Sequence, residues 1–208
     1  MSASNGLSVC PTSHRKSLGQ RLRCRVARLW LGILQHVFQF DAWHSNSPYS
    51  CRPYKRVVVG IVNSLRPKSV VEVGCGLGEI LSRTCARERF GFDSDPAVVR
   101  AARFLHPRGT RWVAADASAV PELLPRGQGI DCLVMINWIH DLRPEQLAEC
   151  VLPLLPRARY VLLDAIDQDA PPSYRFRHDF GFLAGVTERI SITRAAGEPR
   201  SFVLYQVI

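Results

Sequence analysis

Three glycines and an acidic residue stand close together in the first half of the chain. Residues 72–78 read Glu-Val-Gly-Cys-Gly-Leu-Gly and end a short β-rich run. Glycine has no side chain, so it allows a tight turn and lets the backbone approach a ligand closely. A dinucleotide-binding loop would carry its third glycine at position 79, where this chain has Glu79. The spacing therefore predicts either a ligand-binding loop of another kind or a purely structural turn.

Carboxylates follow the next two β-rich runs as well. Asp93 ends one run and Asp116 directly follows the other. The carboxyl ends of parallel strands share one edge of an α/β sheet, and open α/β sheets bind ligands at that edge. A carboxylate at Asp93 can accept hydrogen bonds from both hydroxyls of a ribose, and it would repel a 2′-phosphate. Helix capping is the alternative role for Asp93, but Asp95 before Pro96 already fits that cap.

This combination of an acid, a GxGxG loop and two further strand-end acids resembles the class I S-adenosylmethionine-dependent methyltransferases. The resemblance covers roughly residue 55 to the C-terminus. It implies a doubly wound Rossmann-like α/β sheet, mostly parallel, with seven strands in the order 3-2-1-4-5-7-6 and a C-terminal antiparallel hairpin. It also implies S-adenosyl-L-methionine as the cofactor, bound by Glu72, Gly74, Cys75, Gly76, Gly78, Asp93, Ser94, Asp116, Ala117 and Asn137.

The roles of these residues follow from the resemblance and from the chemistry of the cofactor. In the family the glycine loop passes under the methionine part, and the position of Asp116 accepts from the adenine amino group. The ammonium and sulfonium of the cofactor are cationic, so Glu72 and exposed carbonyl oxygens suit them. We expect no metal ion: Asp164, Asp167 and Asp169 could be imagined as ligands, but they are better interpreted as a solvated turn.

Two histidines are candidates for a catalytic base. The stretch Asn137-Trp138-Ile139-His140 resembles the Asn-x-x-His segment that faces the transferred methyl group in related enzymes. A histidine is largely neutral at pH 7, and Asp141 or another carboxylate could orient His140. His178 is the second candidate, and a packing role is the alternative for both. The chain lacks the Pro-Pro-aromatic and Pro-Cys motifs of base methyltransferases, which disfavours methylation of nucleic-acid bases.

The elements that must position these residues alternate between strands and helices, as in a parallel sheet covered on both faces. The pattern predicts strands over residues 69–73, 90–93, 111–115, 130–136, 160–164, 189–193 and 202–207. It predicts helices over residues 21–40, 53–65, 78–87 and 144–155, and another that starts at Asp95-Pro96. The last two strands are joined by a short segment with Gly and Pro, which indicates a hairpin.

The N-terminal part differs from the rest in charge and pattern. Residues 1–69 hold 11 of the 27 Lys and Arg residues and one of the 18 acids, Asp41, so the net charge of +9 belongs to this part. We expect a basic helical or lid segment over residues 1–54 and the cofactor-binding domain over residues 55–208. Residues 21–40 form a basic amphipathic helix whose apolar face needs a cover: the protein's own domain, a second subunit or an anionic membrane. The aromatic and polar stretch 41–51 reads as a loop, and its residues 41–45 either cover the acceptor site or are an ordinary aromatic anchor.

The composition fits a single globular domain with reduced thiols. Seven scattered cysteines without a CxxC pair indicate neither a disulfide framework nor a zinc site. The N-terminal apolar stretch 29–40 is shorter than the roughly 20 residues of a membrane-spanning helix, and no signal peptide is evident. We therefore expect a cytoplasmic protein that is a monomer or a homodimer.

These observations predict methyl transfer to an oxygen or nitrogen atom of a small molecule, sugar or lipid. The alternatives are an RNA or protein methyltransferase that uses the basic N-terminal arm, and a non-catalytic cofactor-binding scaffold subunit. Nucleic acid is an improbable partner because the body is nearly neutral, whereas the N-terminal helix allows peripheral membrane contact.

Overall fold

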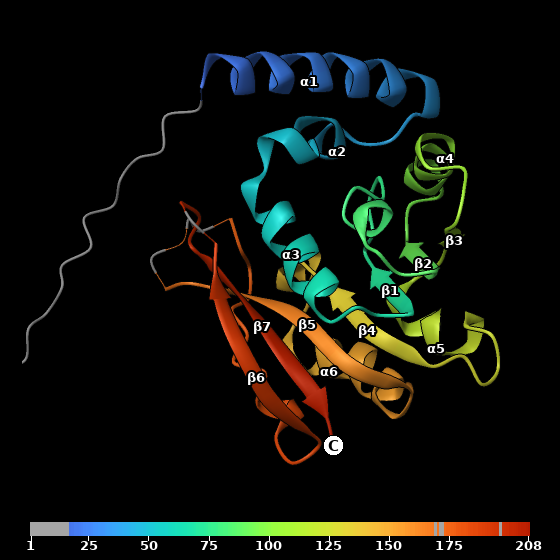
Figure 1. Ribbon diagram of the computed structural model, residues 1–208, viewed down its shortest axis with the longest axis vertical. Coiled ribbons are helices and arrows are strands. Elements are labelled where there is room, and N and C mark those ends of the chain that lie inside the picture. The colour runs from blue at the N-terminus through green and yellow to red at the C-terminus, as the bar shows by residue number, and fades with distance from the viewer. Residues whose placement is uncertain (1–16, 169, 171–172, 196) are drawn as a thin grey trace, which may run out of the picture.

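A seven-stranded sheet runs through the middle of the molecule (Figure 1). The computed structural model describes residues 17–168, 170, 173–195 and 197–208. The strand order is β3-β2-β1-β4-β5-β7-β6, which confirms the prediction. The strands are β1 Ser69–Val73, β2 Glu88–Asp93, β3 Arg111–Ala114, β4 Ile130–Met135, β5 Ala158–Ile166, β6 Thr187–Arg194 and β7 Arg200–Val207.

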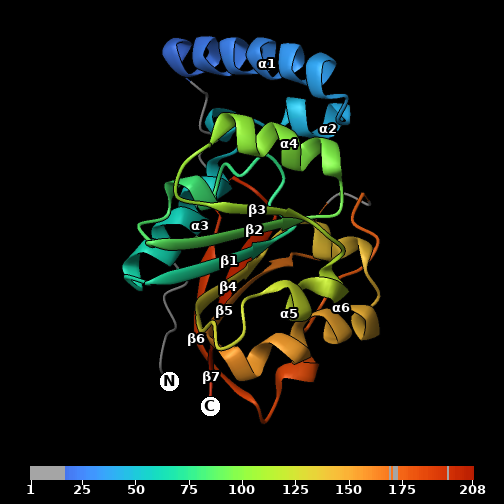
Figure 2. The ribbon, with the colours of Figure 1, turned by 90° about the vertical axis from the view of Figure 1, so that its right-hand side faces the viewer.

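Helices cover both faces of this sheet. They are α1 Leu18–Phe38, α2 Ala42–Asn46, α3 Pro53–Ser64, α4 Pro96–Leu105, α5 Val120–Leu123 and α6 Pro144–Val151. One hydrophobic core joins α3 and α4 to one face of the sheet, and a second core joins α5 and α6 to the other face. Figure 2 shows this layering, with α4 and α6 on opposite sides of the strands.

The strands from β3 to β5 are parallel, and the C-terminal hairpin is antiparallel. All five residues of β1 are buried, as expected for a central parallel strand covered on both faces. Strand β7 pairs with β5 and brings Arg200 opposite Ile166 at the carboxyl end of β5. The hairpin therefore delivers a C-terminal residue to the edge of the sheet where the glycine loop also lies.

The predicted helix over residues 78–87 is wrong. This segment forms turns and one 3₁₀ turn, η2 Leu81–Arg83. The carboxylate of Glu72 accepts the backbone N–H of Leu81 at 3.1 Å, and the Thr84 hydroxyl donates to the Leu81 carbonyl at 2.8 Å. These side-chain bonds occupy backbone groups that a longer helix would need, so the segment ends after one turn.

Two other segments differ from the prediction. Residues 41–51 contain α2 and a 3₁₀ turn, η1 Tyr49–Cys51, instead of a loop, and Asp41 caps α2 by accepting from His44 N at 3.1 Å. Helix α6 stops at Val151 and continues as the 3₁₀ segment η5 Leu152–Arg157, which contains Pro153 and Pro156. Proline has no N–H to donate, so an α-helix cannot continue through these positions.

Helix α1 packs on the body along one side only. Leu31, Leu34 and Phe40 form a small core with Leu77 and with Ala97, Val98 and Ala101 around α4. Cys24 is also buried, and Phe38 packs partly against this core, whereas seven large apolar residues of α1 are exposed: Leu18, Leu22, Val26, Leu29, Trp30, Ile33 and Val37. Figure 2 shows α1 stacked above α2 and α4, away from the sheet. None of the helices in the described part of the chain has the length and apolar character needed to cross a membrane.

Candidate active site

A cavity of about 1780 Å³ opens at the carboxyl ends of the central strands. The glycine loop, the turn after β2 and the segment after β4 form one half of its lining. The other half comes from α2, the start of α3, the loop around Tyr174 and the β6–β7 turn. Ligand pockets commonly measure about 300–1,000 Å³, so this cavity has room for a cofactor and a small acceptor together.

The glycine loop depends on backbone geometry that other residues rarely adopt. Gly74, Gly76 and Gly78 have φ of +70°, +53° and +73°. A methyl group on Gly74 would lie 2.0 Å from the Trp138 ring, and one on Gly78 would lie 2.2 Å from the Trp112 ring. Gly74 and Gly76 line the cavity, whereas Gly78 does not. Gly78 therefore serves packing under Trp112, and its predicted cofactor contact stays a prediction.

Glu72 is a buried carboxyl at the floor of the cavity. It is 3% exposed and accepts one hydrogen bond, from Leu81 N. Burial raises the pKa of Glu72 to about 8, against the smaller lowering effects of the Leu81 hydrogen bond and of Lys55. The group is therefore mostly protonated at pH 7 in this structure, and a cationic ligand would favour its ionised form.

Asp93 connects the glycine loop to the turn after β2. Its Oδ2 accepts from Gly76 N at 2.9 Å, and its Oδ1 accepts from Asp95 N at 3.1 Å. Each carboxylate oxygen has room for a further hydrogen bond. Asp93 and Ser94 both line the cavity, so the carboxylate can accept from ligand hydroxyls while it holds the loop.

An ion pair that the residue spacing does not predict joins the start of α3 to the segment just after the glycine loop. Lys55 Nζ lies 2.5 Å from Glu79 Oε2 and donates to the Ser47 carbonyl at 2.7 Å. The other oxygen of Glu79 accepts from Tyr49 N at 2.8 Å. Glu79, the residue that breaks the dinucleotide-binding spacing, thus ties the start of α3 to the glycine loop.

The segment after β4 turns sharply into the cavity. Asn137 has φ of +77°, and its N–H donates to Asp164 Oδ1 at 2.8 Å. Trp138 lies over the glycine loop, and its indole N–H donates to the Val73 carbonyl at 2.7 Å. A non-glycine residue with positive φ is strained, and such strain persists where surrounding bonds hold it. Here the buried carboxylate of Asp164 is the group that holds it.

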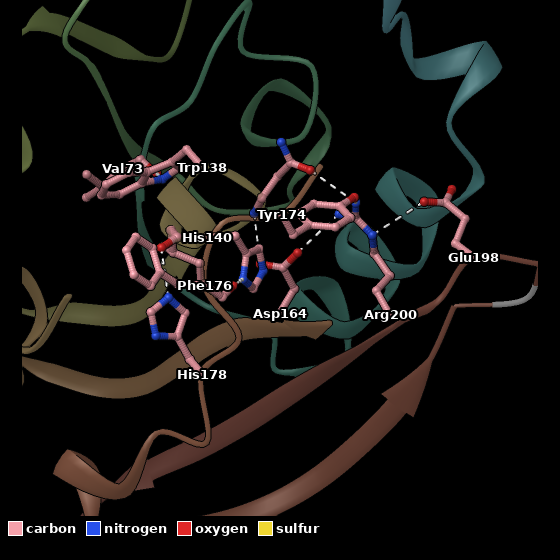
Figure 3. Close-up of polar contacts among 11 residues, drawn as sticks. Val73, Trp138, His140, Asp164, Tyr174, Phe176, His178, Glu198 and Arg200 are labelled. Carbon is pink, nitrogen blue, oxygen red and sulfur yellow. Dashed lines mark hydrogen bonds and ion pairs between the residues drawn. The ribbon is translucent and has the colours of Figure 1, made fainter. Parts of the chain in front are cut away.

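Asp164 is the centre of a buried polar cluster (Figure 3). The interpretation of Asp164 as part of a solvated turn is wrong, because it lies in β5, is fully buried, and has its Oδ2 3.1 Å from Arg200 Nη1. The Arg200 guanidinium also donates to Asn137 Oδ1 at 3.1 Å and to the Tyr174 hydroxyl, and it lies 4.5 Å from the centre of the Tyr54 ring. The sequence contains no motif that pairs Arg200 with Asp164, because the hairpin alone brings the two residues together.

His140 belongs to the same cluster. Its Nδ1 lies 3.2 Å from the Phe176 carbonyl oxygen, and its Nε2 lies 3.3 Å from Asp164 Oδ1. The side chain is 2% exposed. Both ring nitrogens therefore face acceptors of the protein, although His140 is part of the cavity lining. The predicted base role of His140 stays a prediction, and this geometry favours a positioning role instead.

His178 lies behind His140 as seen from the cavity. The two rings stack with centroids 5.6 Å apart, and His178 Nε2 lies 2.9 Å from the Ile139 carbonyl oxygen. Burial lowers the pKa of His178 below its ordinary value. His178 is not part of the cavity lining, so it can act on a ligand only through His140.

Most of the predicted cofactor residues converge on one cavity. The residues in its lining are Glu72, Gly74, Cys75, Gly76, Asp93, Ser94, Ala117 and Asn137. Asp116 is exposed and lies outside the lining, although its neighbours Ala115 and Ala117 are part of it. No cluster of three or more metal-ligating side chains occurs in the described part of the chain, and Asp169 lies outside that part.

Comparison with solved structures supports the fold assignment. N-methyltransferase NodS from Bradyrhizobium japonicum WM9 superposes with a TM-score of 0.62 at 13% identity, over 74% of this chain and 97% of that chain. Magnesium protoporphyrin IX methyltransferase from Synechocystis PCC 6803, solved with bound S-adenosylmethionine, gives a TM-score of 0.60 at 12% identity over 95% and 100%. This chain has the class I S-adenosylmethionine-dependent methyltransferase fold. No protein-family model matches it.

One curated protein is similar in sequence. Indolepyruvate C-methyltransferase from Streptomyces griseus is 27% identical over 155 residues. The match covers 67% of this chain and 46% of that protein, so the chain spans about half the length of the relative. The resemblance to methyltransferases inferred from the glycine loop and strand-end acids is thus confirmed at the level of the fold.

Proposed function

We propose that the protein transfers a methyl group from S-adenosyl-L-methionine to a small molecule. The observation that carries the proposal is the cavity at the carboxyl ends of β1, β2 and β4, which combines a positive-φ glycine loop with the carboxyl groups of Glu72 and Asp93. Oxygen acceptors at this edge suit the ribose hydroxyls and the cationic groups of the cofactor. The residues present therefore fit S-adenosylmethionine, which would supply the activated methyl group.

Each cofactor residue has a role that its position supports. Glu72 would balance the positive charge of the cofactor, and Asp93 would accept from the ribose while it holds Gly76 N. Trp138 and Asn137 would face the reacting centre, because both line the cavity and Trp138 lies over the glycine loop. Asp116 lies outside the lining, so its contact with an adenine rests on the resemblance.

The acceptor is proposed from the lining and from the curated relative. Tyr54, Tyr174 and Trp43 line the half of the cavity that α2, the start of α3 and the loop around Tyr174 form, and they suit a small organic acceptor. The name of the relative describes a small-molecule acceptor, which supports this class. The acceptor atom that we predict is oxygen or nitrogen, and carbon is the alternative that the name of the relative introduces.

The N-terminal segment is proposed to close the acceptor side. Trp43, His44 and Ser47 line the cavity, although they precede the proposed cofactor-binding domain of residues 55–208. An RNA or protein acceptor is the alternative, held by the basic N-terminal arm, and a non-catalytic scaffold is the second alternative. Methylation of a polymer through this arm would fall steeply as salt is raised, whereas methylation of a small neutral molecule would not.

Calorimetric titration tests the cofactor. We expect S-adenosylhomocysteine to bind and NAD to give no signal, because Glu79 occupies the third glycine position of a dinucleotide-binding loop. Mass spectrometry then follows labelled methyl transfer to extracts separated into metabolites, lipids, RNA and protein. Tight NAD binding without an S-adenosylhomocysteine signal would contradict the proposal. Binding without transfer to any fraction would favour the scaffold.

A further inference from the structure

His44 and Asp41 form a side-chain pair on the N-terminal wall of the cavity. Asp41 Oδ1 lies 3.0 Å from His44 Nδ1 and also accepts from His44 N at 3.1 Å. One carboxylate oxygen thus fixes both the backbone and the ring of the histidine. Burial raises the pKa of Asp41, but its interactions with His44 outweigh that effect and lower the pKa on balance. An ionised carboxylate at this distance favours the tautomer with its proton on Nδ1, which leaves Nε2 as an acceptor.

The ring of His44 faces the glycine loop. A methyl group built on Gly76 would lie 3.2 Å from His44 Cδ2 and 3.5 Å from His44 Nε2. The side chain is 15% exposed, and His44 lines the cavity. The rings of Phe40 and Trp43 contact it edge-on, at centroid distances of 6.3 and 5.1 Å. The imidazole is therefore held in place with its Nε2 edge above the loop.

Helix α2, which carries His44, is anchored to its surroundings. The Ser45 hydroxyl donates to Gln35 Oε1 of α1 at 2.9 Å. On the other side, Ser47 accepts from Lys55 through its carbonyl oxygen and from Arg52 through its hydroxyl. These contacts tie α2 both to α1 and to the start of α3, so the position of His44 is defined by two elements.

The two histidines of the cavity lining differ in what their ring nitrogens face. Both nitrogens of His140 lie near acceptors, the Phe176 carbonyl and the Asp164 carboxylate, but its Nε2 is buried and makes no hydrogen bond with the described residues. His44 Nδ1 lies against the Asp41 carboxylate, and its Nε2 edge faces the glycine loop. The His44 side chain is 15% exposed against 2% for His140, so of these two His44 is the more accessible to a molecule in the cavity.

We propose that His44, oriented by Asp41, is the base that takes the proton of the methyl acceptor, an inference that rests on the proposed function. A bond forms between the acceptor oxygen or nitrogen and the methyl carbon, and the sulfur–methyl bond breaks with its electron pair remaining on sulfur. The acceptor proton passes to His44 Nε2, and Asp41 stabilises the resulting imidazolium. The positive charge lost from the sulfonium thus reappears on the imidazole.

The first test is kinetic. In His44→Gln we expect turnover at saturating cofactor to fall about 10²- to 10⁴-fold. The acidic limb of the pH–rate profile should disappear. The affinity for S-adenosylhomocysteine should stay within about threefold of that of the wild type. Asp41→Asn should retain part of the activity. The matched control is His36→Gln, because His36 lies on α1 outside the cavity and should behave as wild type. The probe is a low-molecular-mass metabolite extract, and methyl transfer is followed by mass spectrometry.

The second test needs no turnover. Nitrogen-15 NMR of the imidazole groups, assigned by comparison with His44→Gln, should show the neutral His44 ring with its proton on Nδ1 and an unprotonated Nε2. Asp41→Asn should weaken that tautomer preference. A proton on Nε2 would overturn the proposal even if no acceptor had been found.

The remaining outcomes are also decisive. If His44→Gln keeps full turnover and its acidic limb while His140→Gln loses them, the base is His140 and the proposal is overturned. A loss of S-adenosylhomocysteine affinity in His44→Gln with unchanged turnover at saturation would make His44 a cofactor ligand and would also overturn it. Failure of the wild type to bind S-adenosylhomocysteine would instead contradict the proposed function, which separates the two failures.

Discussion

Two buried carboxyl groups beside the cavity, those of Asp164 and Glu72, differ in the number of hydrogen-bond donors around them. Asp164 is surrounded by donors: Arg200 and the backbone N–H of Asn137 both bond its oxygens. Glu72 has one donor, Leu81 N, and burial dominates its surroundings. Asp164 is thus held in a hydrogen-bonded ion pair, whereas a buried carboxyl with few partners takes up a proton. The first therefore serves structure, and the second is available to respond to a ligand.

Glu72 should link cofactor binding to pH. Its pKa of about 8 makes the carboxyl neutral at pH 7, and the ammonium group of S-adenosylhomocysteine would favour ionisation. We expect the affinity for S-adenosylhomocysteine to rise by up to about tenfold per pH unit as pH approaches 8. Below that pH, binding should release the proton of Glu72. Calorimetry in buffers of different ionisation enthalpy measures this. Glu72→Gln should abolish the proton release, and a wild-type affinity independent of pH would contradict the role.

The same group should affect stability in the absence of ligand. Between the ordinary pKa of 4.5 and about 8, the folded protein holds a proton on Glu72 that the unfolded chain has lost. The free energy of unfolding should therefore fall as pH rises through this range, by at most about 1.4 kcal/mol per unit. Urea denaturation at pH 5.5, 6.5 and 7.5 measures the slope. A slope for Glu72→Gln as steep as that of wild type would assign the dependence to other groups.

Arg200 should matter more for stability than an exposed arginine. Its side chain is 3% exposed and pairs with Asp164, which is fully buried. Arg200→Met leaves that carboxylate without its cationic partner, at an expected cost of about 3–5 kcal/mol. The double variant Arg200→Met/Asp164→Asn should recover part of the loss because it removes the unpaired charge. Denaturant unfolding of the three proteins tests this, and equal stability of Arg200→Met and wild type would refute it.

At the scale of elements, the glycine loop shows why a turn requires particular residues. Gly74→Ala places a methyl group 2.0 Å from the Trp138 ring at a φ of +70°. We expect this variant to lower the free energy of unfolding by more than 1 kcal/mol and to weaken S-adenosylhomocysteine binding.

The matched control is Gly60→Ala. Gly60 lies within α3, is exposed, and a methyl group there would meet no atom within 4 Å. Alanine should stabilise the helix by up to about 1 kcal/mol and leave cofactor binding unchanged. Thermal unfolding of both variants gives the comparison. If both substitutions were neutral, the loop would not depend on glycine at position 74.

The sequence predicts the repeating elements well and the irregular ones poorly. Strand β1 and the strand order follow from short apolar runs and from the resemblance, and both are confirmed. The helix predicted over residues 78–87 fails because the Glu72 and Thr84 side chains bond backbone groups of Leu81, and hydrophobic periodicity does not reveal such side-chain competition.

In the candidate site, too, residues that are close in sequence are predicted better than residues that only the fold brings together. The residues of the cofactor half belong to one continuous motif or follow successive strands, so the motif and the family resemblance that it carries locate most of them. Arg200 and the ion pair of Lys55 with Glu79 join segments that are distant in sequence, and only the fold brings them together. His44 was predicted only as part of a loop over the acceptor site, because its partner Asp41 and its position above Gly76 depend on α2.

At the scale of the whole molecule, the basic charge and the exposed apolar surface coincide on α1. The helix carries four arginines and no acidic residue. Its Leu31 and Leu34 side chains are covered by the body, whereas Leu29 is 72% exposed and Ile33 is 57% exposed. The protein's own domain thus covers one side of the helix, and a second subunit and an anionic membrane are the remaining candidates for the other.

Paired substitutions on the two sides of α1 separate these contributions. Leu31→Gln/Leu34→Gln removes buried contacts with the body and should lower the free energy of unfolding by several kcal/mol, about 2–5 per residue. Leu29→Gln/Ile33→Gln changes exposed positions and should stay within about 0.5 kcal/mol of wild type. Thermal unfolding, light scattering after gel filtration and sedimentation with anionic liposomes are measured on each protein. A large loss of stability in the exposed pair, together with conversion of a dimer to a monomer, would contradict the expectation and show that a second copy covers this face. Loss of liposome sedimentation at unchanged stability would instead assign the face to a membrane surface.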